Sequence, residues 1–229
     1  MIPWNAITFI GDSVVLLPAA TLLLVWMLLG CAWRMAFWWC MLCGAGLTLV
    51  AATKIAFIGW GVGLGHLDYT GLSGHAMRAA AVLPVLGWAL QAGWPVRIDA
   101  RWRLLPIVAG ALAGIVVSIS RVVLQEHSIS EALLGWVLGC VTAFAFIALA
   151  QTLTLPRRNP WILALSMLAM LPASHAEPAP TNRWITAAAL YLSGHERPFL
   201  RNHSMQRQMI HAPLHGTPAS GVSVSSVAQ

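Results

Sequence analysis

Long runs of hydrophobic residues, separated by short polar segments, fill the first two thirds of the chain. A helix needs roughly 20 apolar residues to cross a bilayer, and five runs reach about that length. They cover, approximately, residues 10–30, 36–58, 74–92, 104–122 and 129–152. A sixth run, 161–173, falls short, because each helical residue advances ~1.5 Å and the hydrocarbon layer is ~30 Å thick. The pattern predicts an all-α protein, a polytopic transmembrane helical bundle with five or six spans.

Composition excludes an ordinary soluble domain. Hydrophobic residues make up 59% of the chain and charged residues 9%, whereas soluble domains carry about 25% charged residues. We expect a transmembrane core over 1–152, the short sixth apolar segment within 153–176, and a polar, largely flexible tail over 177–229. Nothing basic precedes the first apolar run, so a cleavable N-terminal signal is not expected.

The basic residues predict how the bundle is oriented. The net charge of +6 arises from one lysine and twelve arginines, many of them in short loops. If the spans alternate in direction, the arginine-containing loops at 31–35, 93–103 and 153–160 share one side, which the positive-inside rule assigns to the cytoplasm. The opposite ends of the spans and the N-terminus then face outward. Arginines used in this way set topology and do not indicate a nucleic-acid partner.

The segment Ser120–Glu131 places polar and charged residues at the mouth of an apolar span. Charged groups at bilayer depth are costly and tend to mark function. His127 and Glu131 are four residues apart, so on a helix the carboxylate can hold one imidazole nitrogen while the other attacks. Arg121 offers a planar fork suited to phosphate oxygens. This combination favours phosphoryl chemistry at a membrane surface.

Two further segments reach the same predicted side of the membrane. Lys54, near the end of the second span, is the only lysine, and alone it reads equally well as an interfacial lysine. Gly71–His75 precedes the third span, and glycine beside a helix start lets backbone N–H groups approach an anion. A lone histidine at a helix end is usually a cap or packing residue. The case for a functional site therefore depends on the location of these segments on the same side of the membrane.

Together the three segments resemble the motifs of the type 2 phosphatidic acid phosphatase (PAP2) superfamily. The family's motifs are Lys-x6-Arg-Pro, Pro-Ser-Gly-His and Ser-Arg-x5-His-x3-Asp. The corresponding residues here are Lys54, then Leu72-Ser73-Gly74-His75, then Ser120-Arg121 with His127 and Glu131. The resemblance covers residues 54–131 and implies the family's transmembrane helical bundle.

The motifs also depart from the family pattern. Gly61-Val62 stands where the family has Arg-Pro, leucine replaces the proline before Ser73, and Glu131 replaces aspartate. Arg78 lies three residues after His75 on the same helical face, so it can supply the missing positive charge. Arg78 can equally contact a neighbouring helix or a lipid headgroup, and the sequence leaves both roles open.

The resemblance implies a metal-independent hydrolase with a phosphohistidine intermediate and no cofactor. In it His127 attacks phosphorus, Glu131 fixes the tautomer of His127, and His75 protonates the leaving oxygen and later activates water. The expected phosphate-binding residues are Lys54, Ser73, Gly74, Arg121, Arg78 and Ser120. No metal is expected, because the cations neutralise the phosphate and no clean set of metal ligands lies on one side; the pair Cys40 and Cys43 has no second pair.

The expected function is that of a lipid phosphate or diphosphate phosphatase in the bacterial inner membrane, with its site facing the periplasm or cell exterior. Undecaprenyl diphosphate is the first expected substrate, with phosphatidylglycerol phosphate, phosphatidic acid and lipid A phosphate as rivals. Two other readings stay open: a lipid phosphotransferase, and a non-catalytic member that binds lipid or a partner. The sequence does not determine the oligomeric state.

Other polar residues near these segments carry weaker signals. His66 and Asp68 lie between two motifs, and Asp12 can cap a helix or pair with an arginine without being catalytic. The triplet Ser193-Gly194-His195 repeats part of the second motif, but no Ser-Arg-x5-His accompanies it, so we interpret it as coincidence.

The C-terminal part resembles a secretory signal set inside the chain. Arg157-Arg158 is followed by the apolar run Trp161–Leu171 and then by small residues up to Ala176. We expect this segment to insert as a short sixth helix, with the tail outside and Trp184–Leu192 helical on the membrane surface. The alternative is a segment in the inner interface and a cytoplasmic tail, which the arginines of the tail favour.

Overall fold

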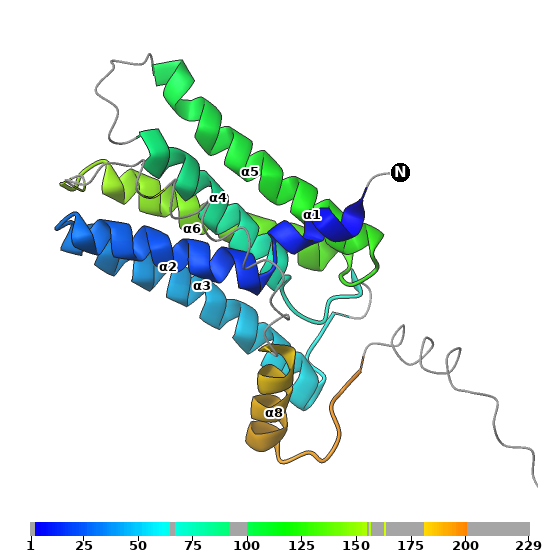
Figure 1. Cartoon of the computed structure of the whole chain (residues 1–229). Coiled ribbons are helices and arrows are strands. Elements are labelled where there is room, and N and C mark those ends of the chain that lie inside the picture. The colour runs from blue at the N-terminus through cyan, green and yellow to red at the C-terminus, as the bar shows by residue number, and fades with distance from the viewer. Residues whose placement is uncertain are drawn as a thin grey trace, which may run out of the picture. The chain divides into compact units, whose positions relative to one another are not determined.

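The computed structural model of the chain (Figure 1) describes residues 3–64, 67–91, 100–154, 156, 163 and 181–200. All structural statements below concern these residues. The helices are α1 (Trp4–Ile10), α2 (Ser13–Leu29), α3 (Trp33–Trp60), α4 (Gly74–Gln91), α5 (Ala100–Val123), α6 (Ile129–Ala150) and α8 (Thr181–Ser193).

The all-α prediction is confirmed, and each of the five long apolar runs corresponds to one helix, from α2 to α6. The helical prediction for Trp184–Leu192 is also confirmed, because α8 contains these residues. The short run 161–173 lies outside the described residues except for Leu163, which is buried in the main hydrophobic core. His66, the loop arginine Arg97 and the tail beyond residue 200 also lie outside the described part.

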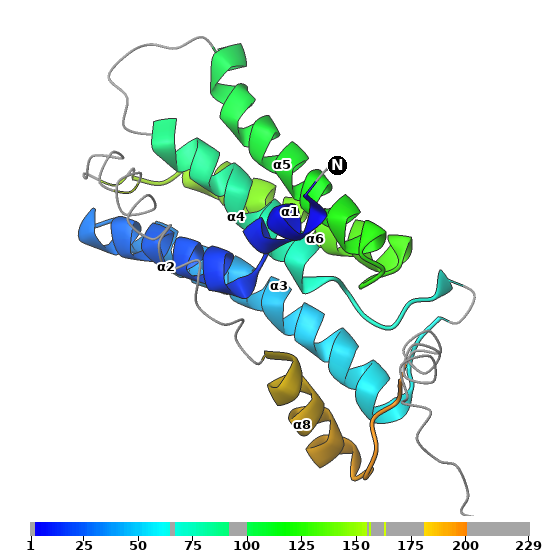
Figure 2. The same ribbon diagram turned by 45° about the vertical axis from the view of Figure 1, so that its right-hand side comes forward.

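Helix α4 differs in composition from the other long helices. Four described stretches are long and apolar enough to cross a membrane, namely Trp4–Leu29, Trp33–Trp60, Trp102–Val123 and Ile129–Gln151. Helix α4 is not among them, yet eleven of its eighteen residues are buried. It packs against α5 and α6 and also contacts α2 and α3 (Figures 1 and 2). Because protein surrounds α4, the helix can carry His75 and Arg78 without exposing them to lipid.

Pairs of glycines four residues apart allow α5 and α6 to approach α4 closely. A methyl group at Gly110 would lie 2.5 Å from the Leu83 carbonyl carbon, and one at Gly135 would lie 2.6 Å from the Ser73 carbonyl oxygen. Methyl groups at Gly114 and Gly139 would also meet the α4 backbone. Small residues spaced in this way let helix backbones pack directly in a bilayer, where hydrophobic attraction between helices is weak. These glycines therefore set how closely α5 and α6 pack against α4.

A short separate helix, α1, precedes the first apolar run near the polar end of the bundle. Helix α1 ends at Gly11, and Asp12 caps α2 by accepting a hydrogen bond of 3.0 Å from the Val14 N–H. Gly11 sits where a methyl group would lie 2.5 Å from Val117 of α5. The break lets α1 turn across α5 (Figure 2) and brings Asp12 to the N-terminal end of α4.

Substitution of Gly139 tests the close packing of α4 and α6. Gly139→Leu should destabilise the purified protein by about 1–3 kcal/mol, because the new side chain meets the Met77 carbonyl and separates the helices. Gly44→Leu is the matched control, since nothing lies within 4 Å of a methyl group at Gly44. Thermal unfolding in detergent measures both. Equal melting temperatures for the two variants would contradict direct contact between α4 and α6.

Candidate active site

The turn between α5 and α6 positions the residues of the third motif. The N–H groups of Glu126 and His127 donate to the Arg121 carbonyl at 3.0 and 3.2 Å, and Gln125 adopts a left-handed conformation with φ of 56°. These bonds end α5 as a C-terminal cap. Helix α6 then begins with a capping box between Ser128 and Glu131. The Ser128 hydroxyl accepts from the Glu131 N–H, and the Glu131 side chain accepts from the Ser128 N–H. His127 is held between the two helix ends.

The carboxylate of Glu131 joins three separate segments of the chain. It is fully buried, and its Oε2 atom lies 2.7 Å from Nδ1 of His127. Its Oε1 atom accepts from both the N–H and the hydroxyl of Thr70, each at 2.6 Å. The Glu131 backbone carbonyl accepts from the N–H of Ser73 at 3.2 Å. One residue therefore fastens His127, the loop before α4 and the start of α4 to one another.

The contact with Glu131 decides the tautomer of His127. An ionised carboxylate only accepts hydrogen bonds, so Nδ1 of His127 carries the proton and Nε2 carries the lone pair. The described part of the chain offers no hydrogen-bond partner to Nε2. The lone pair on Nε2 is therefore available to bind or attack a ligand.

The loop before α4 is folded onto the end of α3 beside Lys54. Gly71 has a φ of 144°, a conformation that side chains rarely adopt, and a methyl group there would lie 3.2 Å from the Lys54 backbone nitrogen. The Leu72 N–H donates to the Thr53 hydroxyl at 3.2 Å. Glycine at position 71 therefore allows the second motif to pass directly over the lysine of the first.

His75 has a carboxylate partner that comes from outside the three motifs. Its Nε2 atom lies 3.3 Å from Oδ2 of Asp12, at the break between α1 and α2. The other oxygen of Asp12 caps α2, so the carboxylate is fixed in place. Each histidine of the site is thus paired with its own acidic residue.

Two arginines supply donors that the described residues do not fully satisfy. Arg78 approaches the Gly11 carbonyl at 3.5 Å, and Arg121 donates to the Thr8 hydroxyl at 3.1 Å. Arg121 also lies 3.7 Å from Glu126. The Nε atoms of both arginines are buried, and none of the described residues accepts from them. Buried donors without partners are rare, and guanidinium groups pair readily with phosphate oxygens, so these donors suit an anion.

Both arginines and both histidines line one polar cavity of about 380 Å³. The functional residues around it are Lys54, Gly74, His75, Arg78, Arg121 and His127. Asp12 and Glu126 add negative charge at its wall, and Thr181, Asn182 and Ile185 of α8 complete it. The cavity brings three cations and two histidines together, a set that can bind a phosphate group and move protons near it.

Comparisons with known proteins relate part of the chain to a described family. The model of the PAP2 superfamily matches residues 53–155, a range that contains all three motifs. The chain is 34% identical over 203 residues to an uncharacterized 22.5 kDa protein in the cps region of Klebsiella pneumoniae, with 86% of this chain and 95% of the relative covered. It is 38% identical over 72 residues to phosphatidylglycerophosphatase B of Bacillus subtilis, covering 31% of this chain and 34% of that protein. No solved structure matches the chain.

The chain belongs to the PAP2 superfamily. It is thus a member of a phosphatase-related family of multi-pass membrane proteins. The first motif of this chain lacks the family's arginine, because Gly61-Val62 stands in place of Arg-Pro. Arg78, which also lies within the PAP2 region, lines the polar cavity.

Two of the predicted phosphate-binding residues do not line the polar cavity of this PAP2 protein. Ser120 is fully buried and its hydroxyl donates to the Val117 carbonyl at 2.6 Å. Ser73 is also fully buried, and its hydroxyl oxygen lies 3.5 Å from the N–H of Ala76 as a cap of α4. In this structure both hydroxyls contact the backbone, because each sits at a helix end packed against a neighbouring helix.

Sequence reasoning missed several residues around the PAP2 site. Thr70 and the cavity-lining residues of α8 carry no motif, and Asp12 was expected only to cap a helix or pair with an arginine. The Asp12 cap is confirmed, and Oδ2 of Asp12 also lies 3.3 Å from Nε2 of His75, a contact that the sequence did not predict. An acidic residue at the end of an apolar run, on the same predicted side as His75, was the available signal.

Anion binding tests whether Arg78 replaces the absent first-motif arginine. Inorganic phosphate should raise the melting temperature of the purified protein, since a ligand that binds only the folded state stabilises it. Arg78→Met should weaken phosphate binding roughly 10-fold or more, the effect of losing a hydrogen bond to a charged group. Arg34→Met, at the exposed start of α3, is the control. If both variants keep the full phosphate-dependent shift, Arg78 is not an anion ligand.

Proposed function

We propose that this PAP2 protein hydrolyses a lipid phosphate or diphosphate through a phosphohistidine on His127. The proposal is supported by one observation above all. His127, with Nδ1 bonded to the buried Glu131, lines the same cavity as Lys54, Arg78 and Arg121. A pre-oriented imidazole among three cations is suited to attack at phosphorus.

The reaction proceeds in two steps. In the first, the lone pair on Nε2 of His127 forms a bond to phosphorus and the bond from phosphorus to the lipid oxygen breaks, while His75 gives that oxygen a proton. Glu131 stabilises the positive charge that develops on the His127 ring. In the second, water attacks the phosphohistidine, His75 takes the proton of the water, and inorganic phosphate leaves. Asp12 orients His75 through both steps.

Positive charge from the protein replaces a metal ion in this proposal. Lys54, Arg78 and Arg121 line the cavity and neutralise the non-bridging oxygens, and the Gly74 N–H at the start of α4 adds a backbone donor. The two unsatisfied Nε donors provide the geometry for this role. The reaction is therefore expected to proceed without a divalent cation.

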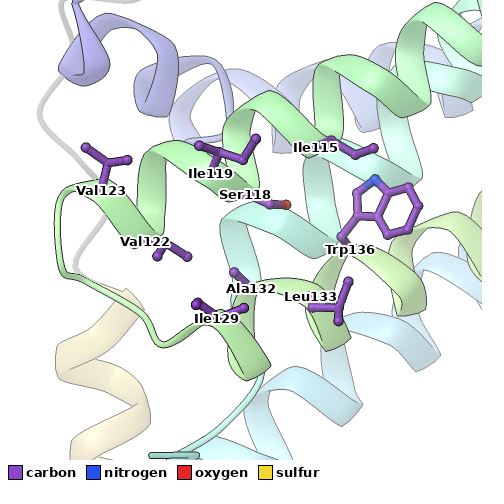
Figure 3. A pocket seen from close by; sticks show the side chains of 9 residues that line it. All are labelled: Ile115, Ser118, Ile119, Val122, Val123, Ile129, Ala132, Leu133 and Trp136. Carbon is purple, nitrogen blue, oxygen red and sulfur yellow. The ribbon is translucent and has the colours of Figure 1, made fainter.

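An apolar groove next to the third motif supports a lipid substrate. The groove has a volume of about 300 Å³ and lies between α5 and α6 (Figure 3). Its walls include Ile119 and Val122, close to Arg121 in the chain, and Ile129, two residues after His127. A groove with such an apolar lining can accept a hydrocarbon chain.

The site is expected to face the outer side of a bacterial inner membrane. By alternation of the spans along the sequence, the arginine-containing loops belong to the opposite side, and the positive-inside rule favours the cytoplasm for that side. Undecaprenyl diphosphate is the first proposed substrate, because this carrier lipid is released on that side of the membrane. Phosphatidylglycerol phosphate is the second, because the partial relative in Bacillus subtilis is named phosphatidylglycerophosphatase B.

Phosphate release from a lipid panel tests the function. Purified protein should hydrolyse at least one of undecaprenyl diphosphate, phosphatidylglycerol phosphate, phosphatidic acid and lipid A phosphate, with full activity in EDTA. His127→Ala should abolish turnover and the labelled phosphoprotein, whereas His75→Ala should slow turnover about 10²–10⁴-fold. A phosphorylated second lipid in place of inorganic phosphate would identify a phosphotransferase. Activity that EDTA removes and zinc or magnesium restores would overturn the mechanism.

The pH dependence of phosphoenzyme formation reports on His127. Burial lowers the pKa of His127 below its ordinary value of 6.5, although the hydrogen bond that His127 donates to Glu131 opposes this shift. Only the neutral ring attacks, so the rate should hold at pH 6.5 and fall only as the pH drops through the lowered pKa. Rapid-quench measurements across this range test it, with the ionisation of the substrate followed separately by phosphorus NMR. An acid limb centred at or above pH 6.5 would contradict the burial effect.

A further inference from the structure

The tail beyond the PAP2 region returns to the catalytic end of the bundle. Helix α8 lies against the last turns of α3, and its fully buried residue Ala189 packs there (Figure 1). A methyl group at Gly59 would lie 3.1 Å from the Ala189 carbonyl oxygen and 3.2 Å from the Ser193 side chain. Gly59 lies five residues after Lys54, so α8 is docked beside the polar cavity.

Two hydrogen bonds from the tail complete the end of α3. The last four carbonyls of a helix have no partner within the helix. Here Nδ1 of His195 lies 2.8 Å from the Gly59 carbonyl, and the Phe199 N–H donates to the Ile58 carbonyl at 2.9 Å. The Phe199 ring also lies against Gly61, where a methyl group would be 3.0 Å from it. The tail is therefore fastened at several points to the helix that carries Lys54.

The first turns of α8 form part of the cavity wall. Thr181, Asn182 and Ile185 line the same cavity as His75 and His127. These three residues bring a hydroxyl, an amide and an apolar group to a wall whose other polar groups are mostly charged. Such groups suit the oxygen-bearing part of a substrate next to its phosphate, either glycerol oxygens or a second phosphate.

Another face of α8 is apolar and exposed. Trp184 is 65% exposed and Tyr191 87% exposed, and residues seven apart lie on one face of a helix. Aromatic side chains of this kind favour the interface between lipid and water. Helix α8 can therefore rest on the membrane surface while its first turns contact a headgroup that enters the cavity from the bilayer.

We propose that α8 is the specificity wall of the active site, with Asn182 and Ile185 contacting the group that carries the reacting phosphoryl group. The proposal rests on the proposed function for the identity of the substrate, but its contacts do not require catalysis. It also requires the tail to lie on the same side of the membrane as the catalytic histidines, because α8 and those histidines line one cavity.

Binding to the full-length His127→Ala protein tests the wall without turnover. Asn182→Ala and Ile185→Ala should each weaken the binding of farnesyl diphosphate or short-chain phosphatidic acid about 3–10-fold, the effect of one hydrogen bond or a small apolar contact. Binding of inorganic phosphate should not change, since the proposal assigns the phosphate to Lys54, Arg78 and Arg121 and not to α8. Trp184→Ala, on the exposed face of the same helix, is the control for detergent-solubilised protein.

Each result of the binding experiment has a defined meaning. A loss confined to the larger ligands supports the wall, whichever of the two ligands shows it, and the ligand affected identifies a second phosphate or a glycerol as the group contacted. Unchanged binding of both ligands, or an equal loss for inorganic phosphate, overturns it. Failure of the wild-type protein to hydrolyse any lipid phosphate would overturn the proposed function but not these contacts.

A labelling experiment tests the placement of α8 independently. In a cysteine-free protein, single cysteines replace Tyr191 on α8, Glu126 at the cavity and Arg34 at the opposite end, all of which are exposed. An impermeant thiol reagent applied to intact cells should treat Tyr191→Cys as it treats Glu126→Cys. If Tyr191→Cys instead behaves like Arg34→Cys, α8 does not belong to the active site.

Discussion

The buried carboxylate of Glu131 is the interaction on which the site depends. Its two oxygens and its backbone carbonyl bind His127, Thr70 and Ser73, which belong to three different segments. A buried charge is stable only when its hydrogen-bonding capacity is filled, so these segments cannot move apart without a large cost. The same residue begins α6 through its capping box with Ser128. Glu131 thus takes part in the initiation of α6, in the placement of the loop before α4 and in the orientation of the His127 ring.

The polar site also depends on the apolar packing beneath it. Glycine pairs on α5 and α6 hold α4 between them, and this shielding lets α4 carry His75 and Arg78 at its first turns. A helix facing lipid would pay heavily for those two side chains. The small residues of the bundle therefore do more than set stability, because they create the protected position at which catalytic charge is tolerated.

Elements on both sides of the PAP2 region complete the cavity. The break between α1 and α2 contributes Asp12, which contacts His75, and α8 contributes part of the wall while its tail caps α3. The triplet Ser193-Gly194-His195 repeats the second motif in sequence, but it helps to hold the tail on α3, since its histidine contacts the Gly59 carbonyl. The PAP2 core supplies the proposed chemistry, and the added elements shape access to it.

The amino-acid sequence by itself determined the helices and the residues of the proposed chemistry. The length of each apolar run predicted α2 to α6, because helix length is a local property of the chain. The spacing of His127 and Glu131 predicted their contact, although His127 lies in the turn before α6 and not on a helix. Only the tertiary structure decided the partner of His75, the burial of the Ser73 and Ser120 hydroxyls and the place of α8. Those contacts join residues far apart in the chain, and they depend on how closely the helices pack, which hydrophobic periodicity does not encode.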